Sequence, residues 1–406
     1  YDVDGATSSA LLARFFVSIG VNHLIYIPDR IKEGYGPNKK AFEKLKNDGV
    51  SVIITVDCGT TAFEPLSFGK SIGLDVIIVD HHIAEVGLPN AVAVINPNRL
   101  DEESRHTQLA AVGVSFLLIV ALNRALRENG FFKKNSMIRE PNLMNLLDIV
   151  ALGTVADMVP LTGVNRALVV QGLKIMAKRR NKGLSALADI AGMDEAPTTY
   201  HLGFLMGPRV NAGGRVGEAN LGAKLLSTEN SQEALDIAKK LDSYNAERRE
   251  IEATVLEEAL ALAEIKAKEK TSQSLVFIAG KNWHPGVIGI VASRLKERYG
   301  LPACILTVQD GVATGSGRSI TGVDLGACVI SARQAGVLTN GGGHAMAAGF
   351  SLDADKLDVF ETFLSERISK QIVEGGILPT LNVDGLITIE GASMDLVEIL
   401  NKMAPF

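Results

Sequence analysis

Three consecutive side chains that could bind a metal follow a short apolar run. Asp80, His81 and His82 come directly after residues 74–79, which are rich in Val and Ile. Such a run predicts a buried strand of a parallel sheet, and open α/β sheets bind ligands beyond the carboxyl ends of their strands. Two adjacent imidazoles are costly to bury without partners. A divalent cation would provide a partner, although the pair by itself also fits a solvated loop.

Four aspartates occupy comparable positions elsewhere in the chain. Asp57 follows the apolar run 52–56, Asp157 closes a helix-like apolar stretch, and Asp2 and Asp4 lie two residues apart at an expected strand-to-helix turn. Carboxylate oxygens and imidazole nitrogens suit manganese, magnesium or a zinc-like ion. Because four carboxylates would balance two divalent cations, the pattern favours a two-metal site. We expect Asp80 to orient a histidine rather than to bind metal directly.

The elements that must position these side chains alternate between short apolar runs and helical patterns. Helices are predicted over residues 8–20, 39–49, 61–73 and 109–129. This alternation is typical of βαβ units, so the fold class is α/β, with a parallel sheet covered by helices on both faces.

The chain is long enough for more than one domain, and its pattern changes near residue 220. Residues 220–270 predict a long, charged, amphipathic connecting helix. A second α/β domain is expected over 271–371, after a first domain over 1–219. Residues 372–406 are expected to form a linker and the start of a truncated C-terminal region.

Glycine-rich segments indicate where phosphate groups could bind. The run 341–343 would let backbone N–H groups approach an anion closely, and His344 follows it. A tight turn with a packed histidine fits the same segment. Arg215 and Arg318 have glycine neighbours that leave the guanidinium group accessible, and arginine binds phosphate through two parallel hydrogen bonds.

Composition limits the class of protein without naming a ligand. The net charge of −5 neither indicates nor excludes a nucleic-acid partner. The three cysteines form no CxxC pair, which favours a reducing, cytoplasmic setting. The longest nonpolar stretch, residues 109–122, is too short to span a bilayer, so no membrane partner is expected. Because residue 1 lies inside a motif, we expect preceding residues to have been lost.

The motifs around these residues resemble those of a known superfamily. Asp-Val-Asp-Gly at 2–5, Val-Asp-Cys-Gly at 56–59, Val-Asp-His-His at 79–82 and Gly-Thr-Val-Ala-Asp at 153–157 resemble the signatures of the DHH phosphoesterase superfamily. The segment 341–349 resembles the signature of the DHH-associated domain. More narrowly, the chain resembles the single-strand-specific exonucleases of that superfamily, through segments 1–8, 29–30 with 33–36, 95–97, 151–157, 207–212, 283–286 and 315–319.

The resemblance implies a role for each matching residue. Two Mn²⁺ or Mg²⁺ ions would be bound by Asp2, Asp4, Asp57, His81, His82 and Asp157, with Asp80 completing the catalytic set. The terminal 5′-phosphate or adjacent backbone would be held by Arg30, Arg215, Ser316 and Arg318, and the scissile nucleotide would be contacted by Gly342, Gly343 and His344. The implied reaction is processive 5′→3′ hydrolysis of single-stranded DNA to mononucleotides in recombination and repair.

The resemblance also implies partners and leaves two other functions open. A single-strand-binding protein and a repair helicase are the expected partners of a monomeric enzyme. The family's first strand would precede Tyr1, and its C-terminal oligonucleotide-binding barrel would follow residue 406. The alternatives are a phosphoesterase acting on short oligoribonucleotides or a small phosphoanhydride, and a non-catalytic scaffold. Retention of all six ligands argues against the scaffold.

Overall fold

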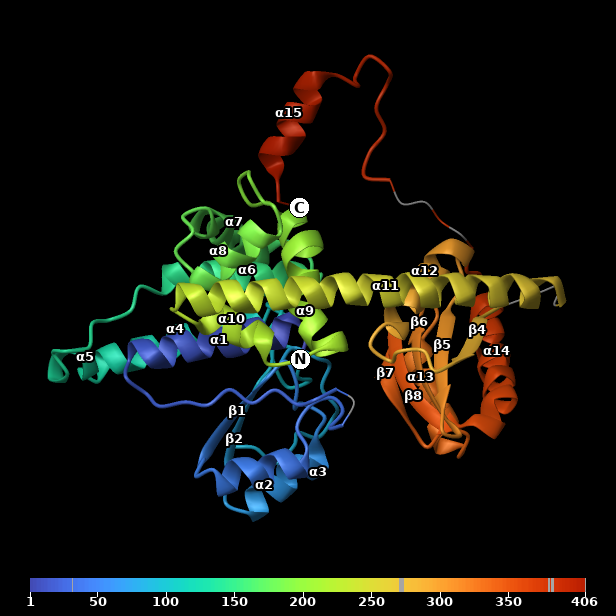
Figure 1. Cartoon of the computed structure of the whole chain (residues 1–406), viewed down its shortest axis with the longest axis horizontal. Coiled ribbons are helices and arrows are strands. Elements are labelled where there is room, and N and C mark those ends of the chain that lie inside the picture. The colour runs from blue at the N-terminus through green and yellow to red at the C-terminus, as the bar shows by residue number, and fades with distance from the viewer. Residues whose placement is uncertain (31, 270–273, 379, 381–382, 406) are drawn as a thin grey trace. The chain divides into compact units, whose positions relative to one another are not determined.

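The computed structural model describes residues 1–30, 32–269, 274–378, 380 and 383–405. Main-chain contacts divide the chain into two compact units, Tyr1–Asn245 with Ser393–Phe406, and Ala246–Ala392. The division falls inside one long helix, α11 (Ser231–Glu269), drawn in yellow in Figure 1. The boundary expected at residues 270 and 271 lies outside the described residues, and the division into two domains, a connecting helix and a C-terminal linker region stays a prediction.

The first unit is mostly helical and contains one small sheet. Its elements before α11 are α1 (Val3–Ser18), α2 (Lys39–Asn47), β1 (Val52–Val56), α3 (Phe63–Ser71), β2 (Asp75–Val79), β3 (Ala93–Ile95), α4 (Ala111–Glu128), α5 (Phe131–Lys134), the 3₁₀-helix η1 (Leu143–Leu146), α6 (Leu147–Ala156), α7 (Gly163–Met176), α8 (Lys182–Ile190), the π-helix η2 (His201–Met206), α9 (Gly207–Val216) and α10 (Leu221–Ser227). Helix α15 (Met394–Met403) also belongs to this unit.

The sheet of the first unit is parallel and covered on both faces, as the sequence predicts. The strand order is β1-β2-β3, and both ladders are parallel. On β2, Val76 and Ile78 pack with side chains of α2 and α3, whereas Val79 packs with side chains of α4 on the other face. Strand residues therefore alternate between two buried layers, which explains why 74–79 is apolar almost throughout.

Two helix starts in this unit follow a polar capping residue and differ from the sequence prediction. Helix α1 begins at Val3 rather than near residue 8, because the Asp2 side chain caps it by accepting from Gly5 N. The long helix begins at Ser231 rather than at 220, because Asn230 accepts from the amides of Gln232 and Glu233 and separates α11 from α10.

The second unit is built on one mixed sheet. Its elements are β4 (Val276–Lys281), α12 (Ile288–Tyr299), β5 (Ala303–Gln309), β6 (Val312–Arg318), α13 (Leu325–Gln334), β7 (Asn340–His344), β8 (Ala347–Asp353), the 3₁₀-helix η3 (Ala354–Lys356) and α14 (Leu357–Glu374). The strand order is β4-β5-β6-β8-β7, parallel between β4 and β5 and antiparallel elsewhere. Helices α13 and α14 pack on one face (Figure 1).

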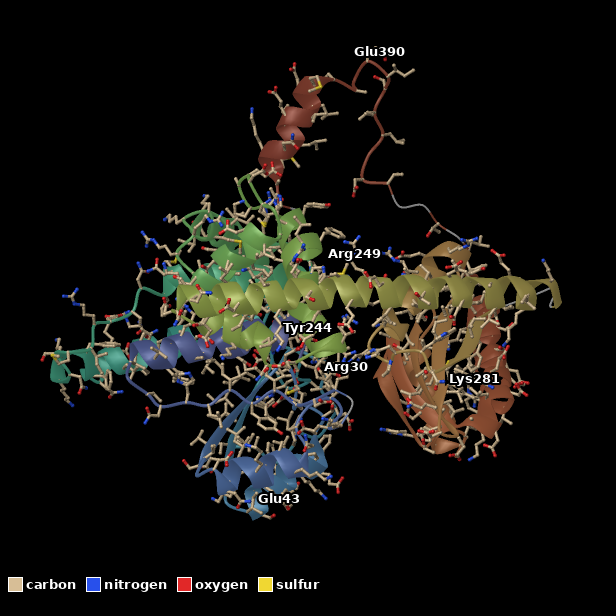
Figure 2. All side chains as sticks on the ribbon, in the orientation of Figure 1. Arg30, Glu43, Tyr244, Arg249, Lys281 and Glu390 are labelled. Atoms are coloured by element: carbon tan, nitrogen blue, oxygen red, sulfur yellow. The ribbon has the colours of Figure 1, made fainter. Side chains whose placement is uncertain are left out.

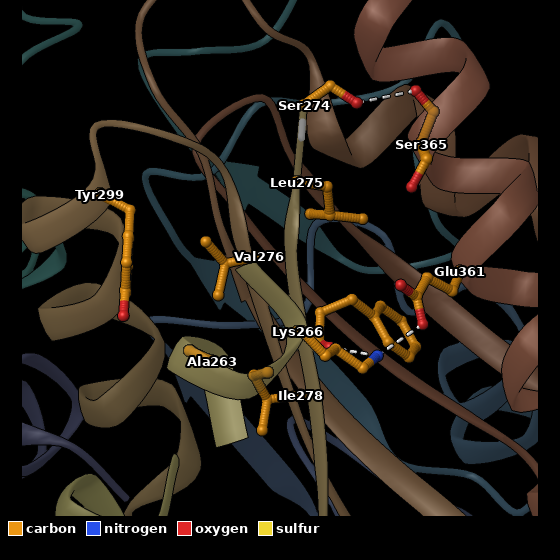
Figure 3. Close-up of a pocket in the computed structure, with 10 residues that line it drawn as sticks. Ala263, Lys266, Ser274, Leu275, Val276, Ile278, Tyr299, Glu361 and Ser365 are labelled. Carbon is orange, nitrogen blue, oxygen red and sulfur yellow. Dashed lines mark hydrogen bonds and ion pairs between the residues drawn. The ribbon is translucent and has the colours of Figure 1, made fainter. Parts of the chain in front are cut away.

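The other face of this sheet is covered along β4 and β5 by α12 and the second half of α11. Val255 and Ala259 of α11 share a buried cluster with Ile278 and Ile305 of the strands. Lys266 adds polar contacts, because its Nζ donates to Phe277 O at 3.0 Å and pairs with Glu361 Oε2 at 2.8 Å, beside a cavity of about 150 Å³ (Figure 3). The second half of α11 is thus an integral part of the second unit.

Both glycine-rich segments of the second unit are strands, so the tight turn that the sequence allowed at residues 341–343 does not form. Gly341 pairs with Phe350, and Gly343 pairs with Ala348, so residues 340–344 form β7. Residues 314–318 belong to β6.

Across the residues that the structure describes, no helix combines the length and apolarity needed to cross a bilayer.

Candidate functional site

The candidate metal ligands come from three places in the first unit. Asp57 follows β1 and Asp80 follows β2, and the register pairs Val56 with Val79, so the two aspartates leave neighbouring strand ends. Asp4 lies in the first turn of α1, and Asp157 caps the carboxyl end of α6. The strand ends and Asp157 agree with the prediction. Asp2 caps α1 and Asp4 lies in its first turn, so both lie at the helix side of the expected strand-to-helix turn.

His81 lies at the centre of the cluster. Its Nε2 lies 3.3 Å from Asp57 Oδ1 and 3.8 Å from Asp4 Oδ2, and its Nδ1 lies 3.7 Å from Asp157 Oδ2. His82 Nδ1 lies 3.9 Å from Asp57 Oδ1. Two groups of three therefore have potential ligand atoms within 4.8 Å of one another, namely Asp57, His81 and His82, and Asp4, His81 and Asp157.

Asp2 lies beside this cluster, although it belongs to neither group. A Cβ atom placed on Gly5 would lie 3.7 Å from Asp2 Oδ1 and 3.8 Å from Asp57 Oδ2. Both carboxylates thus flank Gly5. All six predicted ligands are brought to one end of the small sheet, from positions up to 155 residues apart in the chain.

Hydrogen bonds set the orientation of both imidazole rings. His81 Nδ1 bonds Leu109 O at 3.1 Å, and His82 Nδ1 bonds Asp80 Oδ1 at 2.7 Å. A carbonyl oxygen only accepts, so His81 Nδ1 carries the proton, and the ionised Asp80 requires the same of His82. In the neutral form of each ring the Nε2 atom therefore carries the lone pair, and this form binds a metal.

The Asp80 carboxylate is buried, and both of its oxygens accept hydrogen bonds. Oδ1 also accepts from the amides of His81 and His82, at 2.8 and 3.3 Å, and Oδ2 accepts from Thr60 N at 3.0 Å. Burial by itself would raise the pKa of Asp80, but the hydrogen bond and charge of His82 outweigh it and hold the pKa well below its usual range. This geometry suits a residue that orients His82.

The other carboxylates repel one another. Burial, followed by the neighbouring charges of Asp157 and Asp2, raises the pKa of Asp4 well above its usual range. Burial and the charges of Asp2 and Asp4 do the same for Asp57, and burial with Asp2 raises the pKa of Asp157 to about 7. These three carboxylates resist ionisation, and divalent cations would stabilise their charged form. The donor set therefore fits a metal centre.

The amino terminus of α4 partly compensates this negative charge. Asp4 Oδ2 accepts from Ala111 N at 2.6 Å, and Oδ1 accepts from Val112 N at 2.8 Å. Helix amino termini favour anions, so these bonds hold Asp4 in place.

Asn96 and Asn98 hold the backbone of the histidine pair and were missed by sequence reasoning. Asn96 Nδ2 donates to His82 O at 2.8 Å, and Asn98 Nδ2 donates to His81 O at 2.5 Å. The motif Asn-Pro-Asn after β3 was a usable signal, because asparagine side chains readily bond backbone groups of neighbouring loops.

Two of the predicted phosphate-binding arginines lie near Tyr1 in the first unit. The Arg30 guanidinium carbon lies 4.3 Å from the centre of the Tyr1 ring, and Arg30 is labelled in Figure 2. Arg215 lies in the last turn of α9, where a Cβ on Gly214 would lie 2.3 Å from Tyr1 O. Glycine is therefore required there so that α9 can approach Tyr1 closely.

Four other predicted substrate residues share one face of the second unit's sheet. Ser316 and Gly342 both pair with Gly349, and Arg318 and His344 both pair with Ala347. Opposed residues of an antiparallel ladder point to the same face, as do residues two apart, so Ser316, Arg318, Gly342 and His344 form one row, called here the β6–β7 strip. Gly343 points to the opposite face.

The backbone of the β6–β7 strip is accessible at its glycines, and one cationic side chain, Arg318, is held by a hydrogen bond. No atom lies within 4 Å of a Cβ placed on Gly342 or Gly349. Arg318 Nη1 donates to Ser316 Oγ at 3.1 Å, and both side chains face Gly289 in the first turn of α12. This surface could bind an anionic backbone.

Comparisons with known proteins agree with this architecture. A model of the DHH family, N-terminal domain, matches residues 1–154, and the DHHA1 domain matches residues 272–370. Single-stranded-DNA-specific exonuclease RecJ of Salmonella typhimurium is 38% identical over 415 residues, covering 100% of this chain and 71% of the relative. The Escherichia coli protein of the same name is 37% identical over 413 residues, with the same coverage.

Solved structures give the same result. The crystal structure of exonuclease RecJ bound to manganese has a TM-score of 0.75 and 31% identity, covering 91% of this chain and 88% of that one. RecJ of Thermus thermophilus in complex with Mn²⁺ has a TM-score of 0.75 and 30% identity, covering 91% and 51%. The fold and the candidate metal cluster define a DHH-family protein with a DHHA1 domain. Within that class, the chain belongs to the RecJ family of single-stranded-DNA-specific exonucleases.

Proposed function

We propose that this protein is a metal-dependent exonuclease that hydrolyses single-stranded DNA from its 5′ end to mononucleotides. The observation that carries the proposal is the pair of three-residue groups that share His81. Membership of the RecJ family supports the substrate, since the relatives are named for single-stranded DNA.

The proposed ligands are Asp2, Asp4, Asp57, His81, His82 and Asp157, and the proposed ions are Mn²⁺ or Mg²⁺, which relatives bind in crystals. When bound, two such ions supply an activated water and neutralise charge that develops on the phosphodiester. Asp80 keeps the His82 ring in the ligating tautomer. Asp4, fixed by the α4 amides, and Asp157, at the end of α6, hold opposite sides of His81.

We assign the substrate contacts from the chemical groups that can bind phosphate. Arg30 and Arg215 would bind the 5′-phosphate, since guanidinium groups match phosphate oxygens. The β6–β7 strip would contact backbone phosphates near the scissile nucleotide through Ser316, Arg318 and His344, while the exposed backbone at Gly342 allows close approach. Gly343, on the opposite face, would support this strip rather than touch the strand. We further propose a cytoplasmic monomer working with a single-strand-binding protein and a repair helicase.

The decisive experiment is digestion of single-stranded DNA labelled at its 5′ end, with Mn²⁺ present. We expect the label to appear first as a mononucleotide, before internal cuts. Arg318→Gln should raise KM for a long strand, whereas Arg333→Gln on α13, which packs on the other face of the same sheet, should not. Uniform internal cleavage, or faster turnover of dinucleotides than of long strands, would contradict the proposal and favour a short-substrate phosphoesterase.

A further inference from the structure

We propose that Tyr35 is a positioning residue that fixes the metal ligands and joins them to the phosphate-binding arginine Arg30. Tyr35 touches the main chain of Asp57 and the rings of His82 and Tyr1. The inference rests on the proposed metal centre, and it assigns a role to a side chain that is not itself a ligand.

The hydroxyl of Tyr35 holds the backbone of Asp57. It donates to Asp57 O at 2.7 Å, while Asp57 N donates to Val79 O at 3.0 Å. Asp57 has φ 57°, in the left-handed region that non-glycine residues seldom adopt. Both main-chain polar groups of Asp57 are therefore held while the residue keeps this conformation, and that conformation directs its carboxylate at His81.

The ring of Tyr35 contacts both sides of the site. It meets His82 edge-on, with ring centres 6.3 Å apart and planes at 81°, and it meets Tyr1 at 5.7 Å and 78°. Arg30 lies over the other ring of that pair, 4.3 Å from the Tyr1 centre. Within the described part of the chain, the buried Arg30 Nε has no hydrogen-bond partner, so stacking on Tyr1 is an important constraint on the guanidinium.

Packing alone does not fix Tyr35. The residue is 55% exposed, and together with Tyr1 and Asp57 it borders a cavity of about 750 Å³ that extends between α1, residues 21–28 and β1. With open space beside the ring, the hydroxyl bond to Asp57 is the contact that sets its direction. Removing the Tyr35 hydroxyl oxygen should therefore disturb the position of the metal ligands.

The test measures Mn²⁺ binding directly, by titration calorimetry or by electron paramagnetic resonance of the free ion. Tyr35→Phe should weaken Mn²⁺ binding about 5- to 10-fold, the value of one hydrogen bond converted to a binding constant. The matched control is Tyr26→Phe, which loses a phenol bond to Glu33 Oε1 of 2.6 Å in the same segment but no contact with a ligand. Tyr26→Phe should leave Mn²⁺ affinity unchanged.

A second pair of variants separates the two sides of the site. Tyr1→Leu removes the ring under Arg30 and should raise KM for 5′-phosphorylated DNA roughly 3-fold or more, with Mn²⁺ affinity unchanged. Tyr1→Phe keeps the ring and should behave as the parent. Equal Mn²⁺ affinity in Tyr35→Phe and the parent would overturn the inference, as would an equal loss in Tyr26→Phe. If the parent protein bound no Mn²⁺ at all, the proposed function itself would fail, whatever the Tyr35 variants do.

Discussion

Replacing Asp80 by Asn is the sharpest test of how this metal centre is organised. The substitution keeps the shape and most acceptor positions but removes the negative charge that His82 Nδ1–H meets at 2.7 Å. A hydrogen bond to a charged group is worth about 1.5–3 kcal/mol, and each 1.4 kcal/mol is tenfold. We therefore expect about 10- to 100-fold weaker Mn²⁺ binding, in the range found for residues that orient metal ligands.

The assay is hydrolysis of 5′-labelled single-stranded DNA across a Mn²⁺ series, with His82→Ala and Asp57→Ala beside it. If Asp80 orients His82 rather than binding metal itself, Asp80→Asn should recover most of the parent rate at high Mn²⁺. The ligand variants His82→Ala and Asp57→Ala should remain inactive at the same Mn²⁺ concentration. An Asn carbonyl in the Oδ1 position can still accept from the amides of His81 and His82, whereas Thr60 N loses its acceptor because the second oxygen becomes an NH₂ group. An Asp80→Asn variant that is inactive at every Mn²⁺ concentration would refute the division of roles, as would one with unaltered Mn²⁺ dependence.

Three further predictions concern stability. Mn²⁺ at about 100 times its dissociation constant should stabilise the parent by about 2.7 kcal/mol, and thermal melts of Asp57→Ala should lose that gain while the fold is kept. Asp148, buried at the start of α6, has its pKa raised from 3.8 to about 6, mainly by burial. Because the folded state favours the neutral form of Asp148, protonation of this carboxyl stabilises the folded state. The stabilisation is complete below about pH 3.8 and is lost as pH rises through 6. Asp148→Asn should therefore be roughly 2–3 kcal/mol more stable than the parent at pH 8 and nearly equal to it at about pH 3.5 by denaturant unfolding; a gain that does not change with pH would contradict this reason. Gly214→Ala would place its Cβ 2.3 Å from Tyr1 O, so we expect a loss of at least about 1–3 kcal/mol by the same measurement, and an unchanged midpoint would show that α9 can move away from Tyr1.

Much of the site could be predicted because its residues follow apolar runs. Asp57, Asp80, His81 and His82 end the strands that the Val and Ile pattern marks, and parallel strands bring such ends together. The start of α1 was misplaced, because a capping aspartate allows a helix to begin five residues earlier than its apolar pattern suggests.

The sequence by itself determined which side chains could bind metal, and that two α/β regions flank a long helix. Local patterns are enough for this, since periodicity and polar residues at element ends are properties of short segments. Tertiary structure decided which atoms face one another. The proton on each histidine depends on Leu109 and Asp80, the β6–β7 strip depends on strand register, and the support from Tyr35 depends on a contact across 22 residues. Such pairings are set by how elements pack, which short-range patterns do not encode.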